Sequence, residues 1–322
     1  MSKYLSLLAS GLAIATCSPT PAPPVPVGTV TTLAAPPYTF FENQFQLPNG
    51  DLLISTLTSP NVFKINPKAA SPALTVVATF PDAERVTGIA PAGPGKFAAV
   101  GGNENGWVLD DPYLNIFKLD GTIVDRIQGP TEPSLLNGLI QLPAKPHILL
   151  SADSTNGRIV RWNIQTRTVS TAVTDAALNG DTDPTNPLPL GVNGLKIRGQ
   201  YLYFTNTFQG TFGRFQIDLH TGAKTGPVEI LVQLALPTGF TNAFDDFTFD
   251  AAGNAYVTQH FNSVIKVTPA GVVSVVPGTG TFESPIKTPT SVSVSGDQKW
   301  LYVTTGMSEY SSGGVYKIRI AA

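Results

Sequence analysis

The chain contains almost no cysteine and few charged residues. Among its 322 residues there are one cysteine, Cys17, and three histidines, and charged residues make up 13%. A single cysteine leaves no pair for an intrachain disulfide, and His147, His220 and His260 are too scattered for a zinc motif. The formal net charge is −2 and no lysine or arginine cluster is present. Nucleic acid and anionic membranes are therefore not expected partners.

Common catalytic motifs are also missing. The sequence has no G-x-S-x-G motif, P-loop or G-x-G-x-x-G element in a suitable context, and no N-x-Ser/Thr sequon. What it does have is 42% hydrophobic residues, 30 glycines and 28 prolines, with the glycines and prolines spread between apolar runs. This composition is typical of many short strands separated by turns.

The first 17 residues are predicted to be a secretory signal peptide. Lys3 precedes the apolar stretch 4–15, which is too short to span a bilayer. Two alternatives are an uncleaved anchor and lipidation at Cys17, the second being disfavoured by Thr16 in front of the cysteine. A secreted protein is expected, with a proline-rich spacer at 18–26.

One pattern of strands recurs six times along the rest of the chain. Each copy contains an apolar strand, a Gly/Pro turn, a second strand rich in Leu, Val and Tyr, a polar loop and a third alternating strand. The second strands begin at Asp51, Lys96, His147, Tyr201, Asn254 and Trp300. The third strands begin at Val62, Leu114, Arg158, Gly213, Ser263 and Gly314.

The spacing of the copies predicts an all-β fold, a six-bladed β-propeller over residues 27–322. The first strands are taken to open at Glu42, Gly88, Asn137, Asn193, Asp245 and Pro289, about 44 to 56 residues apart. The last copy lacks a fourth strand, and the segment 27–33 is expected to supply it and close the ring. A pair of β-sandwiches is the competing architecture.

The repeat places distant residues around one opening of the predicted channel. The residues that open the first strands lie on the same face as the loops after the second strands, which span 56–59, 101–107, 153–156, 206–210, 259–262 and 305–312. Expected substrate-binding residues beside this opening are Phe41, Trp107, Asp153, Asn206 and Phe244. Strand packing is the alternative for the aromatic ones.

Four of the opening residues carry side-chain oxygens: Glu42, Asn137, Asn193 and Asp245. Two carboxylates and two amides suit a hard cation such as Ca²⁺ or Mg²⁺. The alternative is that the Asn-Gly pairs form turns and the acidic residues cap loops.

Short motifs resemble the gluconolactonase/regucalcin-like six-bladed propellers. They are residues 41–43, the Leu-Asn-Gly-Leu and Val-Asn-Gly-Leu phrases at 136–139 and 192–195, and the segment 245–256. In that family a glutamate, two asparagines and an aspartate bind a divalent cation, which implies this role for Glu42, Asn137, Asn193 and Asp245. The chain departs from the family pattern at Asp246, where glycine is usual, and after Glu42, where Gly-Pro is usual.

The whole set, with Pro289-Thr290 and residues 301–306, is most similar to a fungal secreted branch that includes hetero-Diels–Alderases of tropolonic sesquiterpenoid biosynthesis. This resemblance implies a cyclase that joins an enone or quinone methide to an alkene and requires no cofactor. Its substrates would be small hydrophobic, polyketide or terpenoid molecules. Hydrogen bonds to the substrate oxygen would come from Asn137, Asn193 or His260.

Two other functions stay open. A Ca²⁺- or Mg²⁺-dependent lactonase would use the same four residues to hold the metal, with Asp245 or Asp246 as base. A non-enzymatic binding propeller would have no enclosed pocket. The sequence does not predict the oligomeric state.

Overall fold

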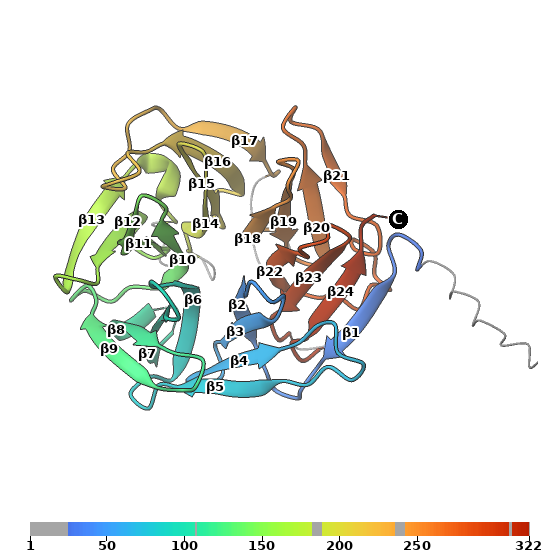
Figure 1. Cartoon of the computed structure of the whole chain (residues 1–322). Helices are drawn as coiled ribbons and strands as arrows, with labels where there is room; N and C mark the ends of the chain where they lie inside the picture. Colours follow the sequence, from blue (N-terminus) through green and yellow to red (C-terminus); the bar gives the residue numbers. More distant parts are fainter. Residues whose placement is uncertain (1–24, 107, 182–188, 236–241, 309–310, 322) are drawn as a thin grey trace, which may run out of the picture.

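Six four-stranded antiparallel sheets form a ring (Figure 1). The computed structural model describes residues 25–106, 108–181, 189–235, 242–308 and 311–321, so the predicted signal peptide and most of the spacer lie outside it. The prediction of an all-β six-bladed propeller is confirmed. Within the described ranges the only helical element is the 3-10 turn η1 (Ala176–Leu178), and no helix there has the length and apolar character needed to cross a membrane.

Five blades are built from four consecutive strands each, numbered from the innermost outwards. Blade 1 contains β2 (Phe41–Gln46), β3 (Leu52–Thr56), β4 (Asn61–Ile65) and β5 (Thr75–Thr79). Blade 2 contains β6 (Arg85–Pro91), β7 (Phe97–Asn105), β8 (Val108–Phe117) and β9 (Ile123–Gln128). Blade 3 contains β10 (Leu136–Leu142), β11 (Lys145–Asp153), β12 (Arg158–Asn163) and β13 (Thr168–Thr174). Blade 4 contains β14 (Val192–Arg198), β15 (Tyr201–Asn206), β16 (Thr211–Gln216) and β17 (Glu229–Gln233). Blade 5 contains β18 (Phe244–Phe249), β19 (Ala255–Gln259), β20 (Ser263–Val267) and β21 (Val273–Val275).

Blade 6 joins the two ends of the propeller. Its inner strands are β22 (Pro289–Val294), β23 (Trp300–Thr305) and β24 (Val315–Arg319), and its outer strand is β1 (Val30–Ala34). Val30 pairs with Ile318 in an antiparallel register. The expected closure by an N-terminal strand is confirmed, and it covers the edge that β24 would otherwise expose.

Apolar side chains from neighbouring blades pack against each other and hold the ring together. In blade 3, Trp162 is fully buried beside Leu139 and Leu190, and its indole Nε1 donates a 2.9 Å hydrogen bond to Ser151 Oγ. Burial of such a ring contributes about 3 kcal/mol or more of hydrophobic free energy. The outermost strands are less covered, and β21 is exposed along its length.

Each innermost strand carries a β-bulge close to its first residue. In blade 1 the pairing steps from Phe41 opposite Thr56 to Gln44 opposite Ile54, so one extra residue is fitted in between. The same irregularity occurs in the other five blades. The residues equivalent to Glu42 are Thr87, Asn137, Asn193, Asp245 and Thr290.

This register corrects two of the six opening positions taken from the sequence. In blades 2 and 6 the residues equivalent to Glu42 are Thr87 and Thr290, each displaced by one residue from Gly88 and Pro289. The Thr87 hydroxyl donates to the Leu136 carbonyl oxygen of the next blade, and the Thr290 hydroxyl donates to Phe41 O at 2.9 Å. These two positions therefore tie neighbouring blades together.

Glycines directly after the bulge position allow the innermost strands to approach each other. A Cβ atom on Gly138 would collide with the backbone oxygen of Asn193, and one on Gly194 would lie 2.6 Å from Asp246 Oδ1. The pairs Asn137-Gly138 and Asn193-Gly194 lie inside β10 and β14 and not in turns. Close strand packing, and not turn geometry, accounts for these glycines.

Candidate functional site

A cavity of about 210 Å³ lies beside the bulges, at one mouth of the ring. Its lining comes from all six blades: Phe40, Glu42, Leu57, Arg85, Leu135, Asn137, Leu190, Asn193, Thr207, Asp245, His260, Thr288 and Met307. Glu42, Asn137, Asn193 and Asp245, the four oxygen-bearing residues singled out in the sequence, are all among them and all buried. With His260 they form the polar floor of the cavity.

Asn137 holds the side chain of Glu42. Its amide nitrogen donates a 2.9 Å hydrogen bond to Glu42 Oε1, and its amide oxygen accepts a 2.7 Å hydrogen bond from Asn43 Nδ2. Both ends of the Asn137 amide are therefore used within the protein. Asn137 therefore serves first to position the Glu42 carboxyl.

The side-chain oxygen of Asn193 accepts no hydrogen bond from the described residues. Its Nδ2 donates to Thr207 Oγ1 at 3.0 Å, and the Thr207 hydroxyl donates in turn to the backbone oxygen of Phe244 at 3.0 Å. Asn193 Oδ1 is buried and has no hydrogen-bond partner among the described residues. A buried acceptor without a partner is costly, so this atom favours a donor or a cation supplied by a ligand.

His260 lies against Asp245. His260 Nε2 and Asp245 Oδ2 are 3.3 Å apart, both residues are buried, and His260 Nδ1 has no partner within the described chain. Burial lowers the pKa of His260 to about 4, although the nearby Glu42 carboxyl opposes this change. The imidazole is therefore neutral near neutral pH.

The two carboxyl groups of the floor favour their protonated forms. Burial, followed by repulsion from Asp245, raises the pKa of Glu42 to about 8. Burial, followed by repulsion from Asp246, raises the pKa of Asp245 well above its ordinary value. Glu42 can thus offer a carboxylic O–H donor to a substrate near neutral pH, beside the neutral imidazole of His260.

Asp246 faces away from this cavity. It lies one residue beyond the bulge position, where Lys196 Nζ is 2.5 Å from its Oδ1 and Ser291 Oγ donates to its Oδ2 at 2.7 Å. It is 2% exposed and is not part of the cavity lining. Its expected role as a base gains no support from this position, because its charge is already used in an ion pair.

Four expected substrate-binding residues lie outside the cavity. Phe41 and Phe244 are fully buried in the apolar cores, where the ring of Phe41 meets that of Phe63 edge to face. Since side chains alternate along a strand, the residue next to a cavity-facing position points into the blade. Asn206 donates to the backbone oxygens of Ala177 and Asn179 and so fixes a loop.

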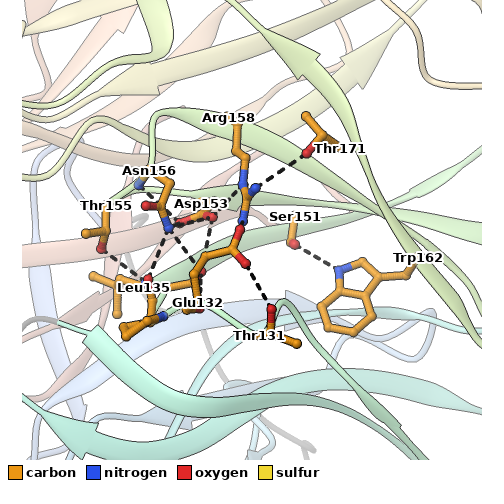
Figure 2. A network of polar contacts seen from close by, with 12 residues as sticks. Thr131, Glu132, Leu135, Ser151, Asp153, Thr155, Asn156, Arg158, Trp162 and Thr171 are labelled. Atoms are coloured by element: carbon orange, nitrogen blue, oxygen red, sulfur yellow. Dashed lines mark hydrogen bonds and ion pairs between the residues drawn. The ribbon is translucent and has the colours of Figure 1, made fainter.

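Asp153 belongs to a separate polar network, shown in Figure 2. Its carboxylate accepts hydrogen bonds from Arg158 Nε at 2.9 Å and from Ser134 Oγ at 3.2 Å, together with contacts from Asn156. Arg158 also forms an ion pair with Glu132. This network fixes the loop after β11. Asp153, Asn156 and Arg158 are not part of the cavity lining, which the network meets only through Leu135, whose backbone N–H donates to Thr155 Oγ1. Trp107, the remaining expected wall residue, lies outside the described residues.

The apolar wall of the cavity was predicted only in part: Leu57 and Met307 lie in loops expected around the opening, but none of the wall side chains was singled out. It contains the apolar side chains of Phe40, Leu57, Leu135, Leu190 and Met307, and the guanidinium of Arg85. A periodic signal for part of it exists: Phe40, Arg85, Leu135 and Thr288 each lie two residues before a bulge position. Aligning the blades on the bulge would have found them.

The floor has part of a ligand set for a hard cation. Glu42, Asp245 and Asn193 Oδ1 offer oxygen atoms, and a cation would relieve both the repulsion between the carboxyls and the unpaired state of Asn193. Asn137 fits less well because its oxygen is bonded to Asn43. Among the residues that the structure describes, no three His, Cys, Asp or Glu side chains gather as a metal site. Water or substrate oxygens would have to complete the coordination of Ca²⁺ or Mg²⁺.

Comparison of the sequence with models of known protein families finds no match, and comparison with curated protein sequences finds none. Solved structures do resemble the chain. A luciferin-regenerating enzyme has a TM-score of 0.63 at 17% identity, covering 90% of this chain and 95% of its own. A calcium-binding regucalcin from Agrobacterium tumefaciens has a TM-score of 0.62 at 16% identity, covering 90% and 92%. A gluconolactonase from Xanthomonas campestris has a TM-score of 0.62 at 13% identity, covering 91% and 89%. At these identities the likeness shows the fold alone, a six-bladed β-propeller that the chain shares with proteins named regucalcin and gluconolactonase.

Proposed function

We propose that the protein is a small-molecule enzyme, a hetero-Diels–Alderase-like cyclase that joins an enone or quinone methide to an alkene in this cavity. The observation that carries the proposal is the pairing of an apolar wall with a buried polar floor formed by Glu42, Asn193, Asp245 and His260. The similarity of the sequence motifs to the fungal branch that includes such cyclases points the same way.

The wall suits a hydrocarbon reactant. Leu57, Leu135, Leu190 and Met307 line the cavity with Phe40, and none of these side chains can satisfy a hydroxyl group. A sugar lactone would leave several of its hydroxyls without partners there, whereas an alkene loses nothing. The wall therefore favours an apolar substrate over a polyol.

The floor suits the oxygen of an enone. A hydrogen bond from the protonated carboxyl of Glu42 or Asp245 to that oxygen withdraws electron density and makes the conjugated system a better acceptor. Burial raises the pKa of Glu42 to about 8 and so favours its donor form near neutral pH, as in other active sites where a neutral carboxylic acid donates a hydrogen bond; burial shifts the pKa of Asp245 in the same direction. Asn193 and His260 flank the same position.

The reaction itself needs only orientation and polarisation. One C–C bond and one C–O bond form while the double bonds shift, and no proton or electron leaves the reactants. Holding the two reactants in a near-attack arrangement lowers the activation barrier. In well-oriented systems this reduction reaches about 7–11 kcal/mol. The absence of a nucleophile motif in the sequence is compatible with this chemistry.

The test is to incubate the purified protein with a tropolone-type quinone-methide precursor and a humulene-type alkene. The expected result is a faster reaction and one dominant stereoisomer, both reduced at least tenfold in Asn193→Ala. Asn115→Ala is the matched control, because Asn115 is buried to the same extent, 4% exposed, but does not line the cavity. Yield and stereochemistry equal to those without protein would reject the proposal.

A second candidate is a divalent-metal-dependent lactonase. The oxygens of Glu42, Asn193 and Asp245 favour it, and proteins named gluconolactonases share the fold. A bound cation would polarise the lactone carbonyl, with Asp245, oriented by His260, placed to accept a proton from water. Its test is hydrolysis of an apolar lactone such as dihydrocoumarin in parallel with gluconolactone, with calcium and after exhaustive chelation. Hydrolysis at the uncatalysed rate under both conditions would exclude it.

A further inference from the structure

Arg85 is the one arginine or lysine among the described residues that line the cavity. It is the first residue of β6, and its side chain is 13% exposed. None of the floor residues is among its hydrogen-bond or ion-pair partners in the described chain. A charged side chain is rarely buried to this extent unless it pairs with another group, so the position of Arg85 in this wall requires an explanation.

The partners of Arg85 leave one donor unused. Nη1 donates to the backbone oxygen of Gly106 at 3.2 Å, and Nη2 forms an ion pair with Glu104 Oε1. The Nε–H group is buried and has no hydrogen-bond partner among the described residues. Glu104 thus occupies one side of the guanidinium with a single oxygen.

The geometry of a guanidinium makes this arrangement incomplete. Nε and a terminal nitrogen on the same edge match the two oxygens of a carboxylate, and such bidentate pairs are stronger than pairs through one oxygen. The Glu104 side chain is 47% exposed, so water competes for its carboxylate and the pair contributes little. A ligand carboxylate that enters from the cavity can replace Glu104 and use both donors.

No side chain of the floor pairs with Arg85. Its partners among the described residues, Gly106 and Glu104, both belong to the hairpin of β7 and β8, so the guanidinium is the one positive group that the described lining turns toward the cavity. In a partly desolvated cavity this charge attracts an anion more strongly than it would in water. The apolar wall next to Arg85 accommodates the remainder of such a molecule.

We propose that Arg85 forms an anion subsite and that the substrate is a compact apolar molecule carrying one carboxylate or one acidic enol. Glu104 holds the guanidinium in the free protein and is displaced when the ligand binds. The inference rests on the proposed function and deepens it: Arg85 anchors the acidic end, so that the reactive carbon atoms lie along the apolar wall above the floor.

Calorimetric binding of trans-cinnamate and of its neutral analogue cinnamamide tests the subsite. Both titrations use the whole protein at pH 7.5 in the presence of a chelator, so that an adventitious cation does not hold the anion. We expect at least tenfold tighter binding of cinnamate than of cinnamamide. Arg85→Gln should abolish this preference with little change for the amide, and Arg85→Lys should keep part of it.

Glu104→Gln provides an independent arm if the Arg85 variants are unstable. Removing the competing carboxylate should tighten cinnamate binding severalfold and leave cinnamamide unchanged. Equal affinities for the two probes, a preference that persists in Arg85→Gln, or no binding of either probe would overturn the subsite. None of these outcomes alters the stereochemical test of cyclisation, and a cyclase that selects only neutral reactants would uphold the function while rejecting the subsite.

Discussion

The amide nitrogen of Asn137 in blade 3 lies 2.9 Å from Glu42 Oε1 in blade 1, so this hydrogen bond joins blades that are not neighbours in the ring. The bond favours the ionised form of Glu42 and partly opposes the effect of burial on its pKa. Asn137 is itself held by Asn43 through a 2.7 Å hydrogen bond. The amide therefore both positions the carboxyl and adjusts its protonation.

Replacing Asn137 with Ala should raise the pKa of Glu42 further, because the carboxylate loses a donor and keeps its burial. We expect cyclisation to slow by about tenfold and the pH at which Glu42 ionises to move up by about one unit. The pH dependence of urea unfolding, compared with that of Glu42→Gln, measures the shift. An unchanged ionisation pH would show that the hydrogen bond does not influence the carboxyl.

Stability should depend on pH through Glu42 and His260. The pKa of Glu42 is about 8 in the folded state against 4.5 ordinarily, so the folded protein holds the proton more tightly and stability falls as the pH rises from 4.5 to 8. At about 1.4 kcal/mol per pKa unit, the loss is on the order of 5 kcal/mol. Urea unfolding in chelator-containing buffers measures it, and Glu42→Gln should make this limb shallower, with the raised pKa of Asp245 accounting for the slope that remains.

The acidic limb has the opposite cause. The pKa of His260 falls from 6.5 to about 4, so the unfolded chain binds the proton more tightly and stability falls as the pH drops from 6.5 to 4. His260→Gln should flatten that limb alone. If each substitution changed both limbs equally, the assignment of the limbs to these two residues would be wrong.

The glycine after the bulge should be intolerant of a side chain. In Gly138→Ala the new Cβ would collide with the backbone oxygen of Asn193 and lie 2.9 Å from Leu195 N, so we expect a loss of about 2 kcal/mol or more. Gly296→Ala is the control, because a Cβ there meets nothing within 4 Å and should change stability by less than about 0.5 kcal/mol. Urea midpoints of the two variants measure the difference, and equal midpoints would contradict the proposed packing role.

Asp153 should matter for folding and not for the reaction. Its side chain is fully buried, and its removal leaves Arg158 without a partner for Nε, so Asp153→Ala is expected to cost about 3 kcal/mol. Below the unfolding temperature, kcat and KM should stay within about twofold of those of the unchanged protein. Asp153→Asn, which keeps one acceptor oxygen, should lose less stability. A rise in KM without a matching fall in kcat would contradict this prediction and would indicate that Asp153 contributes to substrate binding.

Removal of metal ions should separate the two candidate activities. We expect cyclisation to stay within about twofold after exhaustive chelation, since its donors belong to the protein, and metal-dependent lactone hydrolysis to disappear. Calcium at 100 times its dissociation constant would stabilise the fold by about 2.7 kcal/mol if the floor binds it. Asp245→Asn should abolish such stabilisation. Cyclisation that stopped on chelation and returned with calcium would contradict the cofactor-free proposal.

The sequence predicts the ring and the floor because both follow from repetition. Strand alternation and repeat spacing identify the blades, and equivalent positions in the blades bring Glu42, Asn137, Asn193 and Asp245 to one cavity. The same reasoning misplaced the position equivalent to Glu42 by one residue in blades 2 and 6. Gly88 and Pro289 look like strand-opening residues, whereas the bulge, which repeats without a fixed residue type, selects Thr87 and Thr290.

The wall and the neighbouring networks depend on side-chain direction, which the repeat does not specify. Phe40 faces the cavity while Phe41 points into the blade, and both are equally apolar in the sequence. Asp153 has the composition of a ligand-binding residue but finds Arg158 close by in its own blade. Which residue a charged side chain pairs with, and which way an apolar one points, depend on packing in three dimensions.

The pairing of Val30 with Ile318 makes the last sheet from strands near opposite ends of the propeller. The cavity takes side chains from every blade, from Phe40 to Met307. No stretch shorter than residues 40–307 therefore contains the whole lining, and the strands that close the ring, β1 and β24, lie on either side of that stretch. Because β24 must be synthesised and β1 must dock on it before the ring closes, we expect activity to appear as a single event at the end of assembly and not in graded fashion as blades are added.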